Sequence, residues 1–392
     1  MKILHALNSS RVEFRVLPPL SLYIHVPWCV RKCPYCDFNS HEARGEIPER
    51  EYVEALIRDL EMALPLIWGR KVYTVFFGGG TPSLLSGDAV FEILRQVRML
   101  LPLSHDAEIT LEANPGTVEA GRFRDFRDAG VNRLSMGIQS FSDEHLKALG
   151  RIHTSVGARN AIDIAMRHFE NVNLDLMYAL PHQTLEEALQ DVKTALGFSP
   201  QHLSCYHLTL EPNTLFHRNP PEIPDDDASA DMQQNIEVLL LENGYSHYET
   251  SAFAKEKRRS QHNLNYWEFG DYLGIGAGAH SKLSFPDKVI RQMRFKQPRA
   301  YMEQAVKVQT ENEVNSAELP FEFMMNALRL NEGFDPLLFE ERTSLSLLSI
   351  QKELQEAERL GLIERDHRRI APTLLGQRFL NDLLAIFLAD KH

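Results

Sequence analysis

The chain has 392 residues, of which 43% are apolar and 24% charged, and this composition excludes a disordered or fibrous protein. Its 42 Lys and Arg residues against 54 Asp and Glu give a net charge of −12, so nucleic acid is not an expected partner. No apolar run approaches the roughly 18 residues of a membrane-spanning helix, and the N-terminus lacks a signal peptide's apolar core, which together predict a cytoplasmic protein.

Up to residue 215 the sequence predicts strands that alternate with helices. Residues 1–18 show no pattern and are interpreted as an N-terminal extension, and the repeating part covers 19–215. The expected strands are 20–26, 72–77, 108–112, 131–138, 172–177 and 202–210, and the expected helices are 48–64, 86–101, 117–129, 142–168 and 184–197. Such units imply parallel strands with helical crossovers, in either an open doubly wound sheet or a partial (β/α)6 barrel.

The alternation loosens after residue 215. Residues 216–297 are interpreted as an extension of the sheet domain that carries the segments HNLNYW (262–267) and GIGAGAH (274–280). Residues 298–392 predict a smaller, mainly helical domain, with a helix–strand–turn–strand–helix order near its end that is typical of a winged helix. Winged helices often bind DNA, but this region is not strongly basic, so a packing domain or a lid is favoured.

Three of the four cysteines stand together, as Cys29, Cys33 and Cys36, directly after the first predicted strand. The spacing Cys-x3-Cys-x2-Cys places three thiolates on one loop, where they can hold three irons of a [4Fe–4S] cluster and leave the fourth open. The amino and carboxylate groups of S-adenosylmethionine (SAM) can then ligate the open iron. The alternative is a structural zinc site of the three cysteines and His25. Cys205 stands alone and is expected to be a small buried residue.

The cysteine motif and several later motifs resemble the radical SAM superfamily, and within it the oxygen-independent coproporphyrinogen III oxidase family. The motifs are YIHVPWC (23–29), GGGTP (78–82), EANP (112–115), GIQSF (137–141), LGRIH (149–153) and DLMYALP (175–181). DFNSH (37–41) and HNLNYW resemble the heme chaperone branch of that family. The resemblance implies an α/β fold, namely a radical SAM partial (β/α)6 barrel followed by the smaller winged-helix-like domain.

The resemblance also implies a set of cofactor-binding residues, most of which follow predicted strands. It assigns SAM to Gly79, Gly80 and Thr81, and to Glu112, and it places counterparts of a second SAM site at Gln139, Arg151 and Asp175. Tyr23 and Tyr35 flank the cluster cysteines. Each of these residues has a structural alternative: a tight turn, a cap, a surface ion pair or aromatic core packing. Because ligands bind at the carboxyl ends of parallel strands, the positions of Gln139 and Asp175 support their assignment independently.

A heme site is expected at HNLNYW, with His262, Tyr266 and Trp267 as the candidate residues. Histidine is a common axial ligand of heme iron, and aromatic faces suit a flat macrocycle. The chain has 16 histidines, so His25, His207, His247 and His280 remain alternative ligands.

One position separates the two functions that the resemblance allows. The oxidase has a fourth cysteine two residues after the third, and Phe38 stands there in this chain, as a non-cysteine does in the heme chaperones. The resemblance therefore favours a chaperone that binds the cluster, SAM and heme, takes electrons from a donor, and delivers heme to respiratory or other heme proteins, including membrane-associated ones. The alternative is the oxidative decarboxylation of coproporphyrinogen III.

Overall fold

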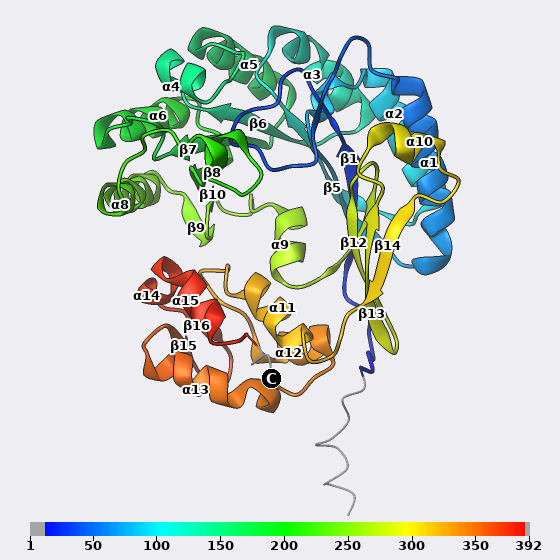
Figure 1. Cartoon of the computed structure of the whole chain (residues 1–392), viewed down its shortest axis with the longest axis vertical. Coiled ribbons are helices and arrows are strands. Elements are labelled where there is room, and N and C mark those ends of the chain that lie inside the picture. The colour runs from blue at the N-terminus through cyan, green and yellow to red at the C-terminus, as the bar shows by residue number, and fades with distance from the viewer. Residues whose placement is uncertain (1–11, 389–392) are drawn as a thin grey trace, which may run out of the picture.

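Most of the chain folds around one curved twelve-stranded sheet (Figure 1). The structure is a computed structural model, and it describes residues 12–388 except for the side chains of 117–120. Six strands follow one another in space as they do in sequence: β1 (Leu20–Val26), β4 (Val72–Gly79), β5 (Leu103–Ala113), β6 (Arg133–Gln139), β7 (Val172–Tyr178) and β8 (His202–His207). All of their pairings are parallel. A doubly wound sheet reverses its strand order at a switch point, and this succession does not, so the partial (β/α)6 barrel is confirmed.

Helices cover the convex side of this sheet, as Figure 1 shows. They are α1 (Glu49–Ala63), α2 (Gly87–Leu100), α3 (Thr117–Ala129), α5 (Ser155–His168), α6 (Leu185–Gly197) and α8 (Asp226–Glu242). Shorter elements join them: β2 (Trp28–Cys29), β3 (His41–Glu42), η1 (Leu64–Leu66), η2 (Pro82–Leu84), α4 (Asp143–Ala148) and α7 (Leu215–Arg218). The predicted capping box of Thr184 and Glu187 is present at α6, and Gly130 ends α3 with a φ of 110°.

The single helix predicted over 142–168 is wrong, because the structure has α4 and α5 there. Gly150 follows α4 with a φ of 68°, a left-handed conformation that ends a helix. Thr154 then caps α5 by accepting a hydrogen bond from the Gly157 N–H. The break leaves Arg151 in the loop between the two helices, where its side chain contacts Cys33.

Antiparallel strands extend the sheet at both edges. β10 (Ala252–Ala254) and β9 (Ser246–Glu249) continue it beyond β8. On the other side, β11 (Asp271–Ile275) pairs in parallel with β1, and β12 (His280–Phe285), β13 (Lys288–Arg294) and β14 (Val308–Glu313) follow it antiparallel. Between the two edges lies α9 (Gln261–Trp267), on the concave side of the sheet (Figure 1). The helix HNLNYW therefore faces the barrel interior.

The six central strands alternate between an apolar outer face and a more polar inner face. Val75, Leu111, Leu134 and Leu174 are fully buried against the helices. Their neighbours one residue away point into the barrel and are largely polar: Thr74, Glu112, Arg133, Ser135, Asn173 and Asp175. Successive side chains of a strand point to opposite faces, so this alternation leaves a polar interior rather than a packed core.

The C-terminal region is a small helical unit with its own core around Phe323, Phe339 and Leu354. Its elements are α11 (Leu319–Ala327), α12 (Pro336–Thr343), η3 (Leu347–Ile350), α13 (Gln351–Arg359), β15 (Ile363–Arg365), β16 (Ile370–Pro372), α14 (Leu374–Arg378) and α15 (Leu380–Ala385). The preceding helix, α10 (Pro298–Glu303), packs instead against α1 and the core of the large sheet (Figure 1). The predicted helix–strand–turn–strand–helix order runs from α13 to α14. The domain boundaries predicted from the sequence remain a prediction. β14 lies after the boundary predicted at residue 297, yet it is a strand of the large sheet.

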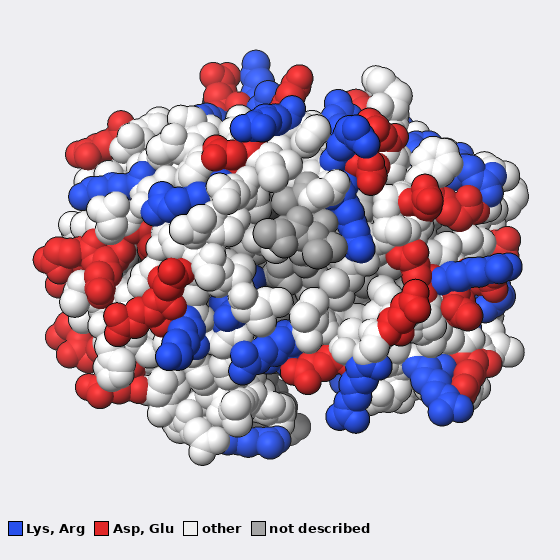
Figure 2. All heavy atoms as spheres, turned by 90° about the horizontal axis from the view of Figure 1, so that it is seen from above, with Lys and Arg blue, Asp and Glu red and all other residues white. Residues whose placement is uncertain are grey.

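The surface is mixed in charge on the face seen from above in Figure 2, where basic and acidic side chains alternate and acidic ones gather at the left. Among the described helices, none combines the length and the apolar character that crossing a bilayer requires.

Candidate functional site

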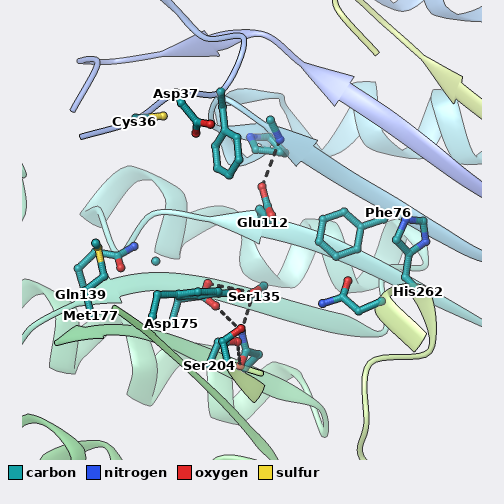
Figure 3. Close-up of a pocket in the computed structure, with 18 of the residues that line it drawn as sticks. Cys36, Asp37, Phe76, Glu112, Ser135, Gln139, Asp175, Met177, Ser204 and His262 are labelled. Carbon is teal, nitrogen blue, oxygen red and sulfur yellow. Dashed lines mark hydrogen bonds between the residues drawn. The ribbon is translucent and has the colours of Figure 1, made fainter. Parts of the chain in front are cut away.

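A cavity of about 640 Å³ occupies the concave side of the sheet, between the cysteine loop and α9. Figure 3 shows Cys36 and Asp37 at one end of it, Glu112 in the middle, and Phe76 with His262 at the other end. Most of the residues predicted from the sequence line this cavity: Tyr23, Tyr35, Cys36, Gly79, Thr81, Glu112, Gln139, Asp175, His262, Tyr266 and Trp267. Cys29, Cys33, Gly80 and Arg151 are not among the lining residues, but each contacts one of them or is next to one in the sequence.

The cysteine loop carries thiols whose neighbours suit a bound cluster. Arg151 points its Nη1 at the Cys33 sulfur, 3.6 Å away, and Cys36 lies 3.9 Å from the Ser40 hydroxyl. Such N–H and O–H contacts stabilise cluster thiolates and adjust their potential. Burial raises the pKa of Cys29 and of Cys36, so these thiols hold their protons until a metal takes their place. Three thiols on one loop with these neighbours therefore fit a [4Fe–4S] cluster.

His25 cannot serve as a fourth ligand without losing a hydrogen bond. Its Nε2 lies 2.9 Å from the Asn39 carbonyl oxygen, which can only accept, so this nitrogen carries the proton. Its Nδ1 lies 3.0 Å from the Tyr23 hydroxyl and accepts from it. Both ring nitrogens are therefore occupied, which disfavours the zinc site considered from the sequence.

The glycine segment at the end of β4 holds the cysteine loop in place. The Gly80 and Thr81 N–H groups donate to the Val26 and Trp28 carbonyls, both at 2.7 Å. Gly79 has a φ of 112°, and a Cβ there would lie 2.4 Å from the His25 ring. A Cβ on Gly80 would lie 2.5 Å from the Trp28 oxygen. These close approaches explain why glycine is required at both positions.

Arg151 joins the cysteine loop to two strand ends. Its Nη2 donates to the Asn114 side-chain oxygen at 2.7 Å and to the Gly137 carbonyl at 2.8 Å. Asn114 in turn donates to the Thr81 hydroxyl at 3.0 Å. Gln139 ends β6 with a φ of 69° and faces the cavity beside this network. Residues predicted from four separate motifs are thus brought together.

Two acidic residues face the middle of the cavity. Glu112 accepts a hydrogen bond from the Gly79 N–H at 3.2 Å, and Asp175 accepts from Ser135 at 3.1 Å and from Asn173 at 2.7 Å. Burial, with the Asp175 charge adding to it, raises the pKa of Glu112 to about 8, and burial also raises the pKa of Asp175. Glu112 is therefore protonated at neutral pH until a ligand with donor groups favours its charged form.

We expect Glu112→Gln to stabilise the protein without SAM at pH 8 and to change little at pH 4.5. The unfolded chain releases the Glu112 proton near its usual pKa of 4.5, whereas the native protein keeps it up to about pH 8, so native stability falls across this interval. Glutamine does not titrate, so the variant does not lose this free energy of unfolding, which amounts to at most about 5 kcal/mol. Urea unfolding at both pH values measures it, with the exposed Glu61→Gln as control. An equal gain at both pH values would contradict the raised pKa.

The HNLNYW helix forms the far end of the cavity. The His262 Nδ1 lies 2.7 Å from the Thr74 hydroxyl, which donates its own proton to Ser21, so Nδ1 carries the histidine proton. Nε2 lies 3.1 Å from the Tyr266 hydroxyl and accepts from it. Burial, followed by the charge of Arg133, lowers the pKa of His262 to about 3. His262 is thus a neutral imidazole whose one lone pair is engaged by Tyr266.

Sequence reasoning missed several polar residues of the wall, above all Arg133, Ser135 and Asn173 from the inner face of β6 and β7, and Arg329 from the C-terminal unit. The alternation of polar with apolar residues along the strands was a usable signal for the first three. Arg329 follows α11 and reaches the cavity only through the packing of the C-terminal unit against α9, which no local pattern predicts.

The chain matches two family models and several known proteins. The radical SAM superfamily model matches residues 23–195, and the HemN C-terminal domain model matches 314–379. The chain is 52% identical to the heme chaperone HemW of Escherichia coli strain K12, over 95% of this chain and 99% of that protein. It is 35% identical to the mitochondrial radical S-adenosyl methionine domain-containing protein 1 of Bos taurus, over 94% and 87%.

A solved structure shares the fold. The coproporphyrinogen III oxidase HemN of Escherichia coli, a radical SAM enzyme, matches with a TM-score of 0.80 at 24% identity, over 95% of this chain and 90% of that one. The sequence relatives cover nearly the full length of both partners, whereas the solved structure supports the fold alone. The chain therefore belongs to the HemW family of the radical SAM superfamily.

Proposed function

We propose that this protein is a cytoplasmic heme chaperone, which binds heme in the barrel cavity and passes it to heme-accepting proteins. Cys29, Cys33 and Cys36 hold a [4Fe–4S] cluster, which supplies single electrons when it is bound and reduced. Gly79, Gly80, Thr81 and Glu112 hold SAM beside it, and Gln139, Arg151 and Asp175 form the counterpart of a second SAM site.

The observation that carries the proposal is the size and lining of the cavity, which extends from the proposed SAM residues to α9. A volume of about 640 Å³ lies within the roughly 300–1,000 Å³ of ligand pockets. Tyr206, Phe76, Tyr266 and Trp267 line it and offer aromatic faces to a flat macrocycle. The relatives that are named heme chaperones give this ligand class its identity.

The axial ligand of the heme iron is proposed among the histidines of this cavity. His262 can take this role only if the Tyr266 hydroxyl leaves its Nε2, although its Nδ1–H bond to Thr74 is the kind of support that ligating histidines have. His207 ends β8 at the cavity, and among the described residues its ring has no hydrogen-bond partner. Burial lowers the pKa of His207, so it is neutral and able to bind iron.

The second candidate function is the oxidation of coproporphyrinogen III, because the chain shares its fold with the oxidase HemN. The position where that family has its fourth cysteine is Phe38 here, at the cavity mouth, with 61% of its surface exposed. An apolar ring cannot replace a thiol in proton or electron transfer, which favours the chaperone.

We expect the reconstituted protein with SAM and reductant to bind heme but not to release carbon dioxide from coproporphyrinogen III. A heme titration followed by the Soret band, with a radiolabelled turnover assay beside it, makes the measurement. The same titration on His262→Ala and His207→Ala identifies the ligand, because only loss of the true one shifts the Soret band. Exposed His105→Ala is the control. Stoichiometric carbon dioxide release by the wild type would establish the oxidase instead.

A further inference from the structure

Arg133 is a buried cation without an ion-pair partner in the described part of the chain. It begins β6, points into the cavity, and exposes only 2% of its surface. Within residues 12–388 no carboxylate lies within ion-pair distance of its guanidinium, no hydrogen bond forms to it, and its Nε is buried without an acceptor. Charged side chains are almost never buried unless they are paired.

A second buried arginine shows what this fold normally provides. Arg294 exposes 1% of its surface, and it pairs with Asp59 at 3.2 Å and donates to Ser281 and Gln292 at 2.9 Å each. Arg133 has none of this. Glu112 and Asp175 face the same part of the cavity, but Glu112 accepts from the Gly79 N–H, Asp175 accepts from Ser135 and Asn173, and neither pairs with Arg133.

Two further donors of the same wall also lack acceptors. Trp267 Nε1 and Arg329 Nε are buried without a hydrogen-bond partner in the described part of the chain, and both residues line the cavity. The Arg329 guanidinium lies over the Trp267 ring, 4.3 Å from its centre, and its Nη2 pairs with the Glu249 carboxylate at 3.3 Å, so its buried Nε is the nitrogen without an acceptor. Every unpartnered buried side-chain polar atom found in this wall is thus an N–H donor. A wall of this kind is complementary to a group that only accepts, such as a carboxylate.

The place of Arg133 along β6 separates it from the cluster. Gln139 and Gly137 end this strand beside Arg151, which contacts Cys33. Arg133 stands six residues earlier than Gln139, or about 20 Å at the rise of a strand. A SAM whose carboxylate binds the cluster iron cannot reach so far. The partner of Arg133 is therefore a carboxylate on another molecule, or on the far side of a large one.

We propose that Arg133, assisted by the Trp267 and Arg329 donors, binds a carboxylate of the cargo, and that in a heme-binding cavity this carboxylate is a porphyrin propionate. The proposal rests on the proposed function, because it takes heme as the cargo. It makes Arg133 a specificity residue, which selects porphyrins that keep a free propionate and orients them with this edge away from the cluster.

The experiment compares heme with heme dimethyl ester, in which both propionates are blocked, by Soret titration of the reconstituted full-length protein. We expect Arg133→Met to weaken heme binding by at least about 10-fold, and Arg133→Lys to restore part of the loss. The ester should bind wild type and Arg133→Met equally weakly. Arg299→Met, at an exposed arginine outside the cavity, is the matched control.

Each further outcome has one meaning. If wild type binds heme and its ester with equal affinity, or if Arg133→Met binds heme normally, the propionate site is overturned while the heme chaperone stands. If Arg133→Met loses labelled SAM in equilibrium dialysis and keeps heme, the carboxylate belongs to SAM and the proposal is also overturned. If wild type binds neither heme nor ester, the proposed function itself fails.

A melting curve without ligand excludes a merely structural role. Removal of an unpartnered buried charge should leave the melting temperature of Arg133→Met unchanged or raise it, and added heme should raise that of wild type more than that of the variant. A large fall in the melting temperature without ligand would make Arg133 a structural residue and would overturn the proposal.

Discussion

Replacing Cys29, Cys33 and Cys36 together by alanine is expected to abolish the iron–sulfur absorbance of anaerobically reconstituted protein. Three thiolates on one loop hold three irons of a [4Fe–4S] cluster, and alanine offers no ligand for any of them. The loop itself should persist, because the Gly80 and Thr81 N–H groups and the His25 ring hold it through backbone carbonyls. Iron and acid-labile sulfide analysis, with the visible spectrum, measures the loss.

Cys205→Ala is the matched control for this experiment. Cys205 lies in β8, exposes 6% of its surface, and packs within the main apolar core, away from the cysteine loop. The control should keep the full iron content and the wild-type spectrum. A triple variant that still holds four irons, or a wild type that holds zinc and no sulfide, would refute the cluster assignment.

Gly79→Val is expected to weaken SAM binding by roughly 30- to 150-fold, or about 2–3 kcal/mol. Valine is strained at a φ of 112°, and its Cβ would lie 2.4 Å from the His25 ring, so the strand end must move. The Gly79 N–H would then no longer donate its hydrogen bond to the Glu112 carboxylate, and the cavity wall would shift where SAM is proposed to bind. Equilibrium dialysis with labelled SAM gives the affinity.

Iron content separates loss of SAM from loss of the cluster in this variant. We expect about four irons per chain to remain, because the cysteines and the Gly80 and Thr81 contacts are unchanged. Gly121→Val, in the exposed part of α3 with nothing within 4 Å of its Cβ, is the control and should bind SAM normally. Unchanged affinity in Gly79→Val would leave the proposed SAM position without support.

Local features of this protein could be predicted from the sequence because their physical causes are local. The alternation of strands with helices, the capping box at Thr184 and the left-handed end at Gly130 depend on residues within a few positions of one another. The three cysteines also lie within eight residues, so their spacing alone indicates a cluster loop. Where a local signal was overlooked, as at Gly150, the prediction of one helix over 142–168 failed.

The strand order and the contents of the cavity depend on partners far apart in the sequence, and only the tertiary structure determined them. Both a doubly wound sheet and a barrel satisfy the same periodicity, and only the parallel pairing of β1, β4, β5, β6, β7 and β8 in succession distinguishes them. The lone pair of His262 is engaged by Tyr266 because α9 lies inside the barrel. Arg133 has no ion-pair partner among residues 12–388, because Glu112 and Asp175 accept hydrogen bonds from other groups. Burial and pairing are properties of three-dimensional neighbourhoods, so the spacing of residues along the chain does not contain them.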